Sequence, residues 1–172
     1  MLIDHTQLYD EIWDWICETL HFMPNCWDNG HDFPYGPPFE IPFAHQVYGI
    51  DNVSEAQLDE MNVLAKQALL NAASEGQRIY ALEWKSSGFL CDPESIGEFD
   101  MIWVEDPRYP LNGGYRAYFP EFYPDGDYYF FIDEHKQFGY LGHPWRKEVW
   151  IFGETLLKEF EQIYHKMGWY KL

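Results

Sequence analysis

Residues 118–152 constrain the fold more than any other stretch, because turn residues alternate there with dense aromatic and β-branched runs. Such alternation is typical of strands in an antiparallel sheet. Pro124, Asp125 and Gly126 suit a tight turn, since proline holds φ at about −65° and glycine tolerates a positive φ. We therefore predict a hairpin in which residues 118–123 pair with residues 127–133, with Gly126 at positive φ.

The segment 127–133 is apolar on both faces near its middle, which indicates a central strand covered on both sides. Further strands are predicted at 79–84, 89–92, 99–104, 138–141 and 148–152, with one edge strand inside the proline-rich segment 22–51. The glycines that follow Asn112 fit a hairpin turn or loop, because the strand, helix and lysine of a phosphate-binding loop are missing around them.

Three helices are predicted from apolar side chains at helical spacing. The first covers residues 5–20 and begins with a capping box of Asp4 and Gln7. The second begins with a capping box of Ser54 and Gln57 and ends before Gly76. The third covers residues 156–167. A chain of 172 residues is too short for two ordinary domains without a clear linker. The sequence thus predicts one α+β domain over residues 1–172, a mainly antiparallel sheet of about five or six strands with three helices mostly on one face.

Four motifs resemble a family of small bacterial proteins of unknown function. They are the segments 79–84 (IYALEW), 123–131 (YPDGDYYFF), 142–145 (GHPW) and 152–156 (FGETL). The resemblance covers about half of the chain, and residues 91–116 depart from the pattern, being long and acidic. It implies a fold and transfers no catalytic residue, because no activity is established for such proteins.

Charge is distributed unevenly along the chain. The formal net charge is −18, and residues 1–65 carry 12 acidic groups with no lysine or arginine. A field of this sign repels nucleic acid and anionic membranes and favours a basic protein partner, although solubility alone is the alternative explanation. Candidate binding residues are those of the first helix and the segment after it: Asp10, Asp14, Glu18, Asp28 and Asp32.

A second possibility is a small hydrolase-like enzyme with an aromatic pocket. Its candidate catalytic residues are Glu83, His143 and Asp127, with Asp125 or Asp133 as alternatives to the last. No serine or cysteine nucleophile motif accompanies His143, so a structural imidazole beside Trp145 is the other interpretation.

Metal and cofactor sites are not expected. The candidate ligands are His21, His31, Asp32 and His45. They form neither the spacing of zinc-finger ligands nor a His-Glu-x-x-His helix motif. Cys17, Cys26 and Cys91 are an odd number without a Cys-x-x-Cys pair, which favours free thiols in the cytoplasm. No signal peptide or membrane-spanning segment is expected, and the oligomeric state is left open.

Three functions therefore stay open. The favoured one is a non-enzymatic acidic binding protein, such as an immunity-type or inhibitor protein that neutralises a basic toxin or enzyme. The others are the small enzyme and a phage-type nucleic-acid mimic, in which carboxylates stand in for phosphates. If contacts to a partner were hydrophobic, the proline and aromatic loop at residues 33–43 would be the next candidate surface.

Overall fold

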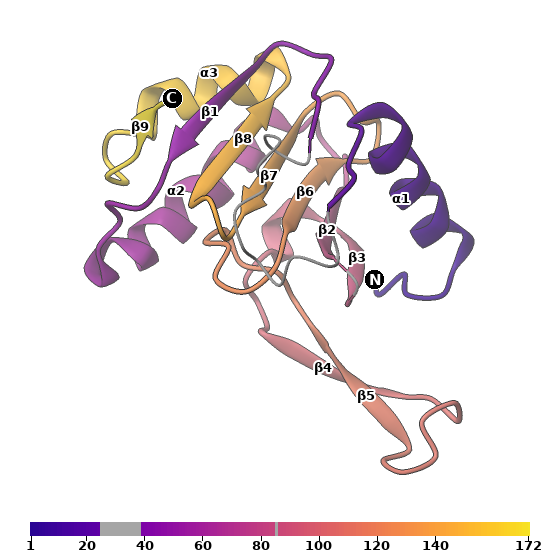
Figure 1. The fold of residues 1–172 in the computed structure, drawn as a ribbon. Coiled ribbons are helices and arrows are strands. Elements are labelled where there is room, and N and C mark those ends of the chain that lie inside the picture. Colours follow the sequence, from indigo (N-terminus) through magenta and orange to yellow (C-terminus); the bar gives the residue numbers. More distant parts are fainter. Residues whose placement is uncertain (25–38, 85) are drawn as a thin grey trace.

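The computed structural model describes residues 1–24, 39–84 and 86–172. A central sheet is formed by β1 (His45–Gly49), β2 (Ile79–Glu83), β3 (Gly88–Cys91), β6 (Tyr129–Asp133), β7 (Gly139–His143), β8 (Glu148–Phe152) and β9 (Tyr170–Lys171). Its seven strands follow the order β3-β2-β6-β7-β8-β1-β9, and every neighbouring pair is antiparallel (Figure 1).

A separate hairpin projects away from this sheet (Figure 1). It consists of β4 (Met101–Glu105) and β5 (Gly114–Tyr118), which pair only with each other within the described part of the chain. A short 3₁₀ helix, η1 (Pro93–Ser95), lies between β3 and β4 along the chain. We call residues 101–118 the arm.

Helices cover both faces of the sheet. Helix α1 (Gln7–Thr19) packs through Ile12 and Ile16 on one face, where β6 contributes Phe130 and Ile132. Helices α2 (Glu55–Ala72) and α3 (Glu154–Ile163) pack on the other face, which includes Phe131. Successive side chains of the central strand β6 thus point into two different apolar cores, as predicted.

The predicted α+β class is confirmed: residues 1–24, 39–84 and 86–172 form antiparallel strands and three α-helices, two of them on one face. The seven-stranded sheet is larger than the predicted five or six strands because β9, near the C-terminus, adds an edge beside β1. The structure has no helix, among the residues it describes, that is long and apolar enough to cross a membrane.

The two predicted capping boxes have different outcomes. Ser54 and Gln57 cap α2, and Gln57 Oε1 accepts a hydrogen bond from the Ser54 backbone N–H at 3.0 Å. At α1 the prediction is wrong, because the N-cap is Thr6, whose hydroxyl accepts from Tyr9 N–H. The carboxylate of Asp4 is instead used in tertiary contacts described below.

The predicted hairpin between residues 118–123 and 127–133 is also wrong. β5 pairs with β4, while β6 pairs with β2 and β7. Gly126 does not have a positive φ, and a Cβ atom there would meet no heavy atom within 4 Å. The segment crosses from the arm to the sheet, where Phe122 stacks on Phe131 with ring centroids 4.4 Å apart. Side-chain burial therefore decides its path, and substitution of Gly126 is expected to cause little strain.

Candidate functional site

His143 lies at the end of β7, completely buried among aromatic rings. Its ring centroid is 4.8 Å from that of Tyr128, 6.1 Å from that of Trp145 and 6.3 Å from that of Phe39. Nδ1 accepts a hydrogen bond from the Arg146 backbone N–H at 3.4 Å. Burial, followed by the nearby Arg146 charge, lowers the pKa of His143 to about 3, so the imidazole is neutral at neutral pH.

Glu83 lies on the opposite face of the sheet from His143. Along β2, Leu82 packs on the α1 side, so the adjacent Glu83 is directed to the side of α2 and α3. His143 shares the α1 side with Leu141. Burial raises the pKa of Glu83, and the charge of Asp125 raises it further. The structure therefore does not bring Glu83 and His143 together as an acid and base.

The three aspartates near β6 are dispersed. Asp125 accepts a hydrogen bond from the Tyr129 hydroxyl at 3.1 Å, on the side of Glu83. Asp127 accepts from the Tyr128 backbone N–H at 2.7 Å, before the strand begins. Asp133 is the last residue of β6, at the opposite end of that strand from Asp125 and Asp127. They do not form one carboxylate cluster around the imidazole of His143.

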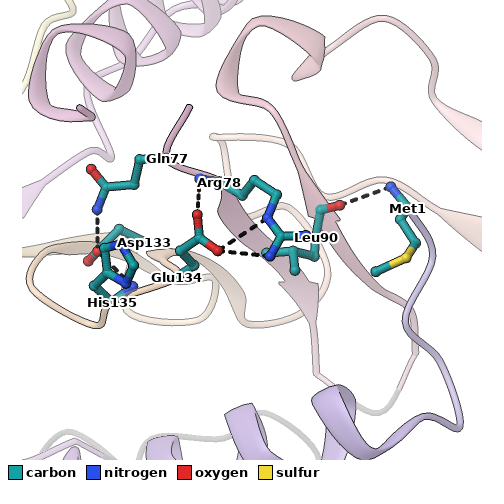
Figure 2. A network of polar contacts seen from close by, with 7 residues as sticks. All are labelled: Met1, Gln77, Arg78, Leu90, Asp133, Glu134 and His135. Carbon is teal, nitrogen blue, oxygen red and sulfur yellow. Dashed lines mark hydrogen bonds and ion pairs between the residues drawn. The ribbon is translucent and has the colours of Figure 1, made fainter. Parts of the chain in front are cut away.

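Asp133 is a completely buried carboxylate with four hydrogen-bond donors. Figure 2 draws two of the donor residues, Gln77 and His135. Oδ1 accepts from the backbone N–H groups of Gln137 at 2.5 Å and Phe138 at 2.7 Å. Oδ2 accepts from Gln77 Nε2 at 2.6 Å and the His135 backbone N–H at 3.0 Å. Because both oxygens are occupied in closing the β6–β7 turn, Asp133 has a structural role.

Three of the five predicted acidic binding residues lie exposed on α1. Asp10, Asp14 and Glu18 follow one another at intervals of four residues, so they form one stripe on the helix surface. None of them belongs to an ion pair with another described residue. Asp28 and Asp32, with His31 and most of the loop at 33–43, lie outside the described residues. The α1 stripe therefore remains a charged surface open to water.

Metal ligands do not gather anywhere in the ranges that the structure describes, where no group of three His, Cys, Asp or Glu side chains could hold an ion. His45 stacks on Trp150, with ring centroids 5.6 Å apart. Cys17 and Cys91 are free thiols, and Cys26 is outside the described ranges.

The arm carries an exposed aromatic face that the sequence reasoning missed. Side chains alternate along both of its strands, and Met101 pairs across the hairpin with Tyr118, as Trp103 does with Arg116. The exposed fractions are 39% for Met101, 51% for Trp103 and 47% for Tyr118. The signal was present in the sequence, since residues 101–105 read Met-Ile-Trp-Val-Glu, but a period of two does not say which face meets water.

The opposite face of the arm packs against the body of the protein. Ala117 is completely buried, and the Tyr115 hydroxyl donates a hydrogen bond to Asp4 Oδ2 at 2.9 Å. The other Asp4 oxygen accepts from the Gly88 backbone N–H at 2.6 Å. Asp4 thus joins the N-terminal segment, the first residue of β3 and the arm, which fixes how the exposed face is presented.

A cavity of about 300 Å³ lies where the arm leaves the body. We call it the base pocket. Its aromatic lining comes from Phe99, Phe119 and Phe122, and its carboxylates are those of Asp100 and Glu121. Partial burial raises the pKa of Glu121, and the charges of Asp125 and then Asp100 raise it further. A pocket and an aromatic surface therefore adjoin at one end of the molecule.

Taken together, the fold and this surface define an acidic α+β protein with a projecting aromatic hairpin. The chain belongs to a family described as "Protein of unknown function (DUF2716)", whose model matches residues 3–157. The resemblance seen in the sequence is confirmed at this level, and the match extends through α1, α2 and the arm.

A relative from Bacillus subtilis (strain 168), described as "Uncharacterized protein YxiI", is 27% identical over 154 residues. The alignment covers 88% of this chain and 86% of the relative. No solved structure matches. The comparisons identify a family and assign no reaction, ligand or partner.

Proposed function

We propose that this chain is a non-enzymatic binding protein that docks through its arm on a basic protein partner, as an immunity-type or inhibitor protein would. The observation that carries the proposal is the exposed arm face of Met101, Trp103, Arg116 and Tyr118. Tryptophan, tyrosine, methionine and arginine are enriched in protein interfaces, and the first two dominate binding hot spots. A projecting hairpin can present these side chains to a concave partner surface.

The charge of the chain supports a basic partner. At −18, the chain attracts cationic proteins over a Debye length and accelerates their encounter. The stripe of Asp10, Asp14 and Glu18 contributes carboxylates that no described residue neutralises. In this proposal the acidic surface steers the partner and the arm supplies the contact area. The free thiols Cys17 and Cys91 fit a reducing compartment such as the cytoplasm.

The small enzyme is supported less well by the geometry, since Glu83 and His143 occupy opposite faces of the sheet. Nucleic-acid mimicry needs carboxylates in place of phosphates, whereas the exposed face of the arm carries methionine, tryptophan, arginine and tyrosine. The arm therefore favours a protein partner over these two alternatives.

An arm variant tests this proposal. Trp103→Ser combined with Tyr118→Ser should weaken binding of a basic protein retained by the wild-type chain by about 30-fold or more, because the loss of even one aromatic hot spot costs roughly 2 kcal/mol or above. The readout is quantitative mass spectrometry of proteins captured from cells of the source organism, followed by a binding constant for each basic protein that is retained. Both positions face water, so the fold should be preserved.

The matched control is Met23→Ser, which removes an apolar side chain that is 80% exposed and lies outside the arm. It should retain the same proteins as the wild type. The proposal is contradicted if the wild type retains no basic protein, or if the arm variant retains the same ones with equal affinity.

A further inference from the structure

The base pocket offers mainly hydrogen-bond acceptors. Asp100 and Glu121 line it, and neither forms an ion pair with any residue in the described ranges. Asn62 also lines it, with a buried side-chain oxygen that accepts no hydrogen bond from the described residues. A buried acceptor of this kind costs free energy until a donor reaches it. The polar part of the pocket therefore suits a ligand that donates hydrogen bonds.

Lys66 is the cation on the pocket wall, and its hydrogen bonds are directed elsewhere. Its ammonium donates to the carbonyl oxygens of Glu94 at 2.6 Å and Ile96 at 2.8 Å, which ties η1 and the chain after it to α2. Two carboxylates and one ammonium leave the pocket with a net charge of −1. A single added positive charge would neutralise it.

The remaining lining suits a long apolar stem and a flat head group. Phe99 and Phe119 meet edge to face with centroids 5.3 Å apart, and Phe122 is buried beside them in the same cluster. A guanidinium stacks on aromatic rings and binds carboxylates through two parallel N–H groups, which a compact ammonium does not do. The cavity of about 300 Å³ is at the small end for ligand sites and suits one side chain.

We propose that the base pocket binds the guanidinium of an arginine side chain presented by the protein partner that docks on the arm. This inference rests on the proposed function for the source of the arginine. Phe99 and Phe119 contact the aliphatic stem and the plane of the head group, while Asp100, Glu121 and the Asn62 oxygen accept its N–H donors. The arm face and the pocket then form one composite site, with aromatic contacts outside and a charged anchor at the base.

The test uses a small probe, so it does not require the partner. Nα-acetyl-arginine amide is titrated into ¹⁵N-labelled protein at low ionic strength, and chemical shifts are followed at the Asn62 side-chain amide and at Gly97, which also lines the pocket. Saturable shifts at both positions are expected. Nα-acetyl-citrulline amide, which is neutral and nearly the same shape, should bind at least about tenfold more weakly, as expected for the loss of a charge-assisted pair.

Variants assign the effect to the pocket. Asp100→Asn with Glu121→Gln should weaken arginine-amide binding by about tenfold or more and preserve the fold, because both residues are exposed at the rim. The Trp103→Ser and Tyr118→Ser arm variant should bind the probe as the wild type does, even where it loses a protein partner. The probe titration therefore tests arginine binding in the pocket, and the capture of proteins tests docking on the arm, so either proposal can fail without the other.

Three results would overturn the arginine assignment. They are the absence of saturable shifts at Asn62 and Gly97, equal binding of the citrulline probe, and tighter binding of Nα-acetyl-lysine amide than of the arginine probe. Each of them can be read in the same titration series.

Discussion

Asp133→Asn is expected to lower the free energy of unfolding by about 3 to 4 kcal/mol. The carboxylate accepts four hydrogen bonds in a completely buried site, two on each oxygen. An asparagine of the same size keeps one acceptor oxygen and turns an NH₂ group toward two of the donors. Buried donors without acceptors cost roughly 1 to 3 kcal/mol each, so the loss should be large. Urea denaturation of both proteins measures it.

Glu134→Gln is the matched control, because it changes the next residue along the chain in the same way (Figure 2). Glu134 pairs with Arg78, whose side chain is 49% exposed, at 2.9 Å. Such a pair contributes about 0 to 1 kcal/mol. Equal destabilisation by the two substitutions would contradict the structural role of Asp133.

His143 is expected to make the protein less stable in acid. Its folded-state pKa is lowered to about 3 from an ordinary 6.5. Below pH 6.5 the imidazole is therefore protonated in the unfolded chain while it stays neutral in the native state. Stability is therefore fully present above that pH and falls as pH decreases toward 3, by up to about 1.4 kcal/mol per pH unit. The slope of unfolding free energy against pH measures this contribution.

The comparison variant is His143→Asn, whose side-chain oxygen can accept the Arg146 N–H in place of Nδ1. Between pH 6.5 and 4.5 the wild type should lose about 2 kcal/mol more than this variant, whatever their difference at pH 7. His135→Asn changes an exposed histidine and should reproduce the wild-type profile. Parallel profiles for the wild type and His143→Asn would show that the imidazole is not held neutral by burial.

Local signals in the sequence predicted what local interactions determine. The capping box of Ser54 and Gln57 located α2, because both partners lie within one turn and need no tertiary contact. The strand β2 was predicted almost residue for residue, since its apolar run is bounded by turns. For α1, Asp4 was predicted to cap the helix. Its carboxylate instead accepts hydrogen bonds from Gly88 and Tyr115, which are distant in the sequence.

Strand partners and exposed faces could not be predicted in this way. The turn residues 124–126 indicated a change of direction, but the hairpin partner of β5 is β4, earlier in the chain. Likewise, Glu83 was expected in a strand and His143 after one, whereas the structure places them in β2 and β7. That they lie on opposite faces depends on the register of β2, β6 and β7. The arm and the base pocket were missed for the same reason, because Phe99 and Phe119 meet only after β4 and β5 pair.

If the acidic surface steers a basic partner to the arm, the association rate constant of a retained partner should depend on charge. We would measure that rate for the wild type and for Asp10→Asn, Asp14→Asn and Glu18→Gln combined, from about 0.01 to about 0.15 M salt, where the Debye length shrinks from about 30 Å to about 8 Å. The wild-type rate should fall by tenfold or more across this range, and the triple variant should associate more slowly at low salt with its fold intact. A rate that depends neither on salt nor on the three substitutions would contradict steering by the acidic surface.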